Sequence, residues 1–209
     1  MAENERRTIE NPVTGERMTS IVSSPESGGD HAEGRGFFPV GWRPPGIHRH
    51  PHQDERITVV SGALRLTVGK ERRELGPGES AVLPRGVWHD FEIIGDRPAE
   101  ARLRAEPALG LEMILATLVG LAKDGKTSKK GLPRPLQGAV IGQFYWEVAQ
   151  FKKPPPAVQR LVLPALAALG RRRGLRPYYE HHFEPGELDA ILDAWAAHRP
   201  WGGHARPTF

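Results

Sequence analysis

Short segments of alternating polar and apolar residues, separated by turn residues, fill the first half of this chain and constrain its fold more than any other feature. Glycines between these segments, as in Ser61-Gly62 and Gly69-Lys70, suit the tight turns of antiparallel hairpins. Many short strands at regular spacing predict a β-sandwich or a closed roll rather than an open sheet. The expected strands run over 55–60, 63–68, 71–75, 80–83, 89–94 and 100–105.

After residue 107 the apolar period becomes that of α-helices. Three apolar stripes predict helices over 111–121, 136–151 and 158–169, and a last amphipathic helix is expected over about 187–198. Pro164 should kink or divide the third helix, and Gly170 or Gly174 should end it. The expected organisation is therefore mainly β: a roll over 1–107, then a helical extension over 108–209 that packs on the roll or at an oligomer interface.

Composition limits the chemistry and the partners. The 209 residues are 38% hydrophobic and include no cysteine, so disulfides are excluded and any metal must bind imidazole or carboxylate groups. The first twenty residues lack the apolar region of a signal peptide, and no apolar run approaches the roughly 18 residues of a membrane-spanning helix, so a cytoplasmic protein is expected.

The net charge of +4 is mild, and the two basic clusters, 123–130 and 171–173, contain no aromatic residues. A nucleic-acid partner is therefore not expected. The nearly uncharged segment 109–121, which precedes several lysines, could lie on a membrane surface, but packing against the rest of the chain is the favoured interpretation.

Histidine and glutamate residues in two of the expected strands form a candidate metal site. His48 and His50 are two residues apart, so in an extended segment both side chains point to the same side. Glu55 shares the apolar face of its strand, whereas Asp54 lies on the opposite face. His89 also begins an apolar face. A carboxylate inside an apolar roll is costly unless it is paired or bound to metal, so these three histidines and Glu55 are predicted to hold one divalent transition metal.

The remaining histidines are weaker candidates. His52 also forms an HxH pair with His50, but Pro51 should bend the chain there, so His52 is expected at the rim of the site. His181, His182, His198 and His204 have no carboxylate at ligand spacing in the sequence and are expected to be surface residues.

The same residues carry a family resemblance. The pattern His48-x-His50-x4-Glu55-x6-Gly62 resembles the first motif of the cupin superfamily, and Gly78-x5-Pro84-x-Gly86-x2-His89 resembles the second. The spacer of fifteen residues between Gly62 and Gly78 is similar to that of bacterial single-domain cupins. Two positions differ: the first glycine of the first motif falls one place early, at Gly41, and Ile93 replaces an asparagine often found after the last histidine.

The resemblance implies a jelly-roll β-barrel whose one metal ion is Fe, Mn, Ni, Cu or Zn, with iron the first choice. It also implies enzymes of several kinds and non-catalytic binding proteins, because fold alone does not determine function. Cupin barrels commonly pair through sheet edges, so a homodimer is expected.

The inward positions of the expected strands are apolar or aromatic, with no lysine or arginine evident among them. A small apolar or aromatic substrate is therefore favoured over a phosphorylated one. The leading hypothesis is a metal-dependent, quercetinase-like oxygenase in which Glu55 also acts as a base. The alternatives are a metal-dependent isomerase or cyclase, and a non-catalytic small-molecule sensor. The predicted pocket residues are Trp42, Ile57, Val59, Leu64, Leu66, Phe91 and Ile93.

Overall fold

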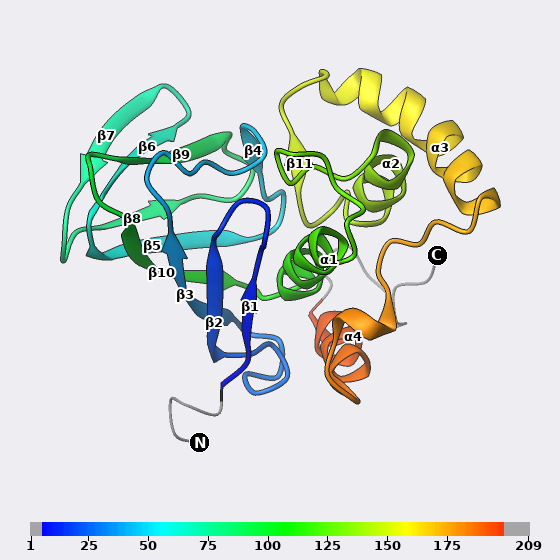
Figure 1. Cartoon of the computed structure of the whole chain (residues 1–209), viewed down its shortest axis with the longest axis horizontal. Coiled ribbons are helices and arrows are strands. Elements are labelled where there is room, and N and C mark those ends of the chain that lie inside the picture. Colours follow the sequence, from blue (N-terminus) through cyan, green and yellow to red (C-terminus); the bar gives the residue numbers. More distant parts are fainter. Residues whose placement is uncertain (1–5, 199–209) are drawn as a thin grey trace.

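A computed structural model of the chain describes residues 6–198. It consists of a barrel of two facing antiparallel sheets, with a group of helices at its side (Figure 1). The first sheet has the strand order β1-β2-β3-β10-β5-β8, and the second has the order β11-β4-β9-β6-β7. The fold is the expected mainly β barrel followed by a helical extension.

Alternating burial along the strands explains why this sequence folds into a barrel. The apolar residues of one face meet inside, where Ile57, Val59, Leu64 and Leu66 are at most 1% exposed. The strands are Thr8–Glu10 (β1), Arg17–Val22 (β2), Ala32–Phe38 (β3), His48–Arg49 (β4), Asp54–Ser61 (β5), Ala63–Val68 (β6), Glu71–Leu75 (β7), Ser80–Leu83 (β8), His89–Ile94 (β9), Ala99–Glu106 (β10) and Gln150–Phe151 (β11).

The helical extension forms a second core of its own. Its members are mutually buried side chains, the largest of which are Trp195 and Tyr145, and their stacked rings lie 5.9 Å apart. The helices are Leu111–Lys123 (α1), Pro135–Phe144 (α2), Pro156–Arg172 (α3) and Glu187–Ala197 (α4), with a short 3₁₀ turn at Glu180–His182. In the part of the chain that the structure describes, no helix is both long and apolar enough to cross a membrane.

The predicted end of the second helix was wrong. The second helix was expected to reach residue 151, but it ends at Phe144, and Phe151 lies in β11, where it pairs with His48 of β4. Pro164 does not divide the third helix, which is continuous over its 17 residues. That helix ends at Arg172, and of the two predicted glycines Gly174 follows its C-cap residue Arg173. Gly174 has a positive φ, and the amide of Leu175 donates to the carbonyl of Gly170.

The third apolar stripe is also not buried as a core stripe would be. Helix α3 packs against α2 at Gly170, which lies against Val140, and through Leu163, which lies against Gly142. Five other large apolar residues of α3 are exposed, and Leu161 is 80% exposed. The apolar face of α3 therefore has no partner among the described residues.

Hydrogen bonds tie the extension to the barrel. The buried amide of Gln53 donates to the carbonyls of Pro107 and Ala108, where the barrel ends. Arg49 of β4 donates to the side chain of Gln150 in β11. On the other side of the molecule, Arg7 donates to the carbonyl of His182. The extension thus reaches the strand that carries His48.

Candidate metal centre

The structure brings the four predicted ligands together at one point inside the barrel. His48 lies in β4 directly opposite His89 in β9, while Glu55 reaches the same point from β5 in the facing sheet. His50 follows β4. One ligand atom from each of these four residues lies within 4.8 Å of those of the other three.

Strand register explains why Glu55 rather than Asp54 faces inward. Asp54 points outward and pairs with Arg85, which also donates its backbone amide to the Asp54 carboxylate at 2.7 Å. The Glu55 carboxylate lies 3.4 Å from Nε2 of His50 and 3.3 Å from Nε2 of His89. The predicted alternation along β5, with Glu55 inward and Asp54 outward, is confirmed.

All three imidazoles are oriented by backbone carbonyls. Nδ1 of His48 lies 2.9 Å from the carbonyl oxygen of Gly46, and Nδ1 of His89 lies 3.0 Å from that of Val87. Nδ1 of His50 lies 2.8 Å from the carbonyl oxygen of Val148, in the helical extension. A carbonyl can only accept, so each Nδ1 carries a hydrogen, and Nε2 of each ring points into the cluster.

This arrangement fits a cation. Nε2 of His89 is buried without a hydrogen-bond partner, and the lone pairs of His50 and His89 face a carboxylate oxygen, which is another acceptor. Acceptors at such distances repel unless a proton or a metal ion lies between them. Three imidazole nitrogens and one carboxylate oxygen suit a divalent transition metal.

The electrostatics of the cluster favour the forms that bind metal. Burial, followed by repulsion from His50 and His89, lowers the pKa of His48 to about 4, so its ring is neutral at neutral pH. Burial alone would raise the pKa of Glu55, but its interaction with His50, and then with His89 and His48, lowers it to about 2. Glu55 is therefore ionised.

The predicted pocket residues fall into two groups. Trp42, Ile57 and Phe91 line a cavity that also contains the four candidate ligands. Trp42 and Phe91 lie with Phe38 in an aromatic cluster whose ring centroids are 4.6–5.6 Å apart. The other predicted residues are buried in the barrel core and are not among those that line this cavity: Val59, Leu64, Leu66 and Ile93.

Cations do lie at the margin of the cavity, although none was evident from the sequence. Arg43 pairs with Asp90 and Glu92, and Arg7 pairs with Glu187. Arg6 and Arg104 also line the cavity and pair with Glu26 and Glu33, and the cationic residues of the lining further include Arg56 and Lys130.

Two predictions about the other histidines have different outcomes. His52 lies outside the cluster and pairs with Glu147, as expected for a rim residue.

The expectation that His181 and His182 lack a carboxylate was wrong, because folding brings Asp124 to within 3.1 and 3.2 Å of their Nε2 atoms, and the His182 side chain is buried. Lys126 donates to the same oxygen of Asp124, so the positive charge of Lys126 already neutralises the Asp124 carboxylate. His198 pairs with Asp30, and His204 lies outside the described residues.

Comparison with known proteins agrees with the predicted resemblance to the cupin superfamily. Residues 36–103 match the family model of the cupin domain, so this part of the chain, which carries all four candidate ligands, is a cupin domain. The search of curated proteins found no match to this chain.

Solved structures resemble the barrel at low identity. The cupin domain of Cnp3 from Schizosaccharomyces pombe is 16% identical, and the alignment covers 44% of this chain and 61% of that one, with a TM-score of 0.40. A cupin-superfamily sugar phosphate isomerase from Silicibacter pomeroyi is 22% identical over 49% of this chain and 72% of that one, with a TM-score of 0.42. KdgF from Halomonas sp. is 20% identical over 49% and 88%, with a TM-score of 0.42.

Proposed function

We propose that this chain is a metal-dependent enzyme that acts on a small apolar or aromatic molecule, with dioxygen as the co-substrate. The observation that carries the proposal is the position of the four candidate ligands in the wall of an apolar cavity. A site of this kind combines a few convergent polar groups with a hydrophobic lining, as small-molecule sites generally do.

The four candidate ligands would have two roles, metal binding and proton transfer. His48, His50, His89 and Glu55 would hold the ion, which would supply Lewis-acid and redox chemistry toward substrate and dioxygen when bound. Iron is the first candidate among Fe, Mn, Ni, Cu and Zn. Glu55 would also accept a proton from an acidic hydroxyl or carbon of the substrate, because its ionised carboxylate faces the cavity.

The aromatic cluster would position the substrate. Phe38, Trp42 and Phe91 present ring faces and edges on the cavity side of the barrel, which suits a planar apolar molecule. The indole nitrogen of Trp42 donates to Glu16 at 3.0 Å, and this bond fixes the ring.

Oxygen consumption tests the proposal. The purified protein is first analysed for bound metals, and then a panel of phenolic and enolic compounds is screened in air and under nitrogen. Oxygen uptake with product formation, lost in Glu55→Gln and kept in Asp54→Asn, is the expected result. Turnover that is equally fast under nitrogen would contradict an oxygenase and indicate an isomerase or cyclase.

A further inference from the structure

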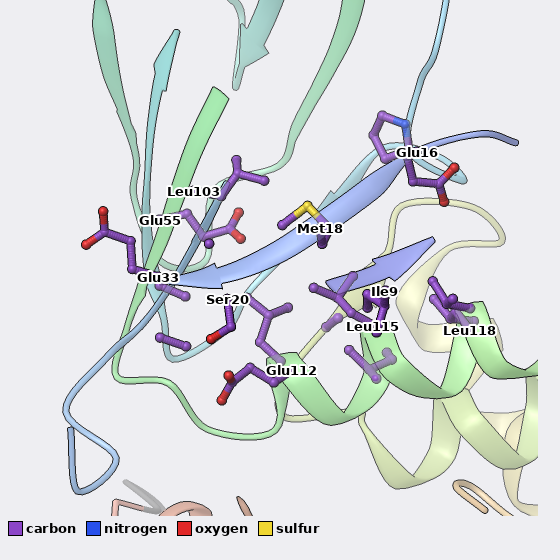
Figure 2. A pocket seen from close by; sticks show the side chains of 18 of the residues that line it. Ile9, Glu16, Met18, Ser20, Glu33, Glu55, Leu103, Glu112, Leu115 and Leu118 are labelled. Atoms are coloured by element: carbon purple, nitrogen blue, oxygen red, sulfur yellow. The ribbon is translucent and has the colours of Figure 1, made fainter. Parts of the chain in front are cut away.

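The cavity that contains the candidate ligands continues out of the barrel to the helical extension. Its volume is about 740 Å³, and its lining includes Glu55 at one end and Leu115 and Leu118 of α1 at the other. Figure 2 shows Leu103 beside Glu55, the side chain of Met18 between the two ends, and Ile9 beside Leu115. The extension is therefore part of the cavity wall.

Helix α1 presents a separate apolar stripe to this outer part. Met113 and Leu121 are fully buried in the helical core, whereas Leu111, Leu115 and Leu118 are only partly buried and line the cavity. Their spacing of four and then three residues places them on one side of the helix. One helix thus supplies both the core of the extension and an apolar wall that faces the barrel.

The facing wall contains apolar residues as well. Its apolar residues are Ile9 of β1, Met18 of β2 and Leu103 of β10, and the polar residues Ser20, Glu33 and Arg104 of the same sheet also line the cavity. Polar groups at the outer end are already engaged: the Glu112 carboxylate accepts a hydrogen bond from the amide of Ser24 at 2.7 Å, and Arg7 pairs with Glu187. A compact polar substrate at the metal would leave this apolar surface uncovered.

We infer that the substrate is an elongated molecule, with a metal-coordinating oxygen head and a long apolar tail that lies between β2 and α1. The inference rests on the proposed metal-dependent function and deepens it by naming the substrate class. The barrel provides the chemistry at the head, and the leucine stripe of α1 selects the tail. This explains why a barrel with a complete ligand set carries a helical extension over one end of its cavity.

A series of straight-chain hydroxamates tests the inference, because the hydroxamate group chelates metal ions while the alkyl length varies. Binding of acetohydroxamate through decanohydroxamate to the zinc-loaded full-length protein is measured by calorimetry. Each added methylene that becomes buried contributes about 0.8 kcal/mol, which corresponds to about a fourfold gain in affinity. We expect affinity to rise by roughly this factor over several successive methylenes.

Two variants test whether the alkyl chain of the hydroxamate binds against α1. In Leu115→Gln the ratio of decanohydroxamate to acetohydroxamate affinity should fall at least about fivefold, because the polar amide replaces an apolar contact. The control is Val60→Gln on β5, which replaces an exposed apolar residue outside the cavity and should leave the ratio unchanged.

The outcomes separate this inference from the proposed function. If acetohydroxamate binds but affinity in the unmodified protein does not rise with chain length, the elongated substrate is overturned and the metal function stands. If no hydroxamate binds the zinc-loaded protein, metal coordination of a substrate fails, and the inference fails with it. The chain-length series needs no variant, so a poorly folded Leu115→Gln does not rescue the inference.

Discussion

At the scale of single residues, the orientation of three imidazole rings is the main determinant of the candidate site. Each ring donates through Nδ1 to a backbone carbonyl, and this fixes the tautomer that leaves Nε2 free to bind. The carbonyl that orients His50 belongs to Val148, which is 98 residues away in the extension. The helical part therefore acts on the metal site through the backbone.

Single substitutions should distinguish the metal ligands from the residues that lie near them. His89→Ala removes one of the four candidate ligands, and it should lower metal occupancy sharply because only three donors remain to bind the ion. Glu55→Gln should reduce binding less, since it keeps an oxygen donor, but should abolish turnover. The measurement is metal content after dialysis against a weak chelator.

Asp54→Asn and His52→Ala are the controls, because both side chains lie outside the cluster. Both should keep the metal. An empty site in Asp54→Asn together with a full site in Glu55→Gln would contradict the ligand assignment.

The titration of His48 in metal-free protein provides a pH test. Burial disfavours its imidazolium form and lowers its pKa to about 4, against about 6.5 in an unfolded chain. Between these values the unfolded state binds more protons, so the free energy of unfolding should decrease as the pH falls from about 6.5 to about 4. NMR titration of the ring gives the pKa directly, and urea unfolding gives the stability.

The variant His48→Asn cannot titrate at this position, so its stability should decrease less over the same pH range. A His48 midpoint close to 6.5 would contradict the buried, neutral ring described above.

The candidate ligands could be predicted from the sequence because the strand period is two. That period placed Glu55 inside and Asp54 outside, and the structure has the same register. The role of Val148 could not be predicted, since its carbonyl is a group that every residue possesses. Asp124 was missed for a similar reason: it is 57 residues from His181, and only the packing of the 3₁₀ turn on α1 brings them together.

At the scale of elements, the strands from residue 54 to 106 were predictable, and the helical half was less so. Alternation and glycine turns are local signals, and they identified six strands to within two residues of their ends. The helix prediction extended to Phe151 because this residue lies three positions after Val148, on the same face of a continued helix, whereas its pairing with β4 is a long-range contact. Strand β11 shows how tertiary pairing overrides a local helical pattern.

Close contact between α1 and the 3₁₀ turn requires a glycine, and this gives a test of helix packing. A Cβ at Gly120 would lie 2.1 Å from Cγ of His182, whose ring is buried against the helix. Gly120→Ala should therefore destabilise the protein by about 1–3 kcal/mol, even though alanine favours helices. Urea unfolding measures the change.

Gly138 of α2 is the matched control, since a Cβ there meets no atom within 4 Å. Gly138→Ala should stabilise the protein by about 0.5–1 kcal/mol through helix propensity alone. If Gly120→Ala were also stabilising, the packing of His182 on α1 would be wrong.

At the scale of the whole molecule, two cores share one cavity. The barrel core and the helical core are separate clusters of buried side chains, and the cavity has walls from both. The two are joined by β11, by Gln53 and by the bond between Val148 and His50. This connection makes the extension a structural part of the candidate site, which neither the strand pattern nor the helical pattern could indicate alone.

The exposed face of α3 leads to the last prediction, a homodimer. Five large apolar residues on this helix are at least 37% exposed, and Leu161 is 80% exposed, while the helix buries its small residues against α2. An interface between identical subunits resembles a core cut in half, and an aliphatic stripe flanked by arginines at its end has that character. We expect two copies to bury their α3 faces against each other.

Light scattering with size-exclusion chromatography distinguishes this interface from one through the sheet edges. The unmodified chain should have about twice the 23.1 kDa mass of the monomer, and Leu161→Glu should reduce it to the monomer mass, because a carboxylate in the apolar stripe is costly to bury. Val82→Glu is the matched control: Val82 is an exposed apolar residue of the edge strand β8, so this change should leave an α3 dimer intact. If Val82→Glu instead gives the monomer and Leu161→Glu does not, the subunits pair through the barrel edge, and the face of α3 is not the interface.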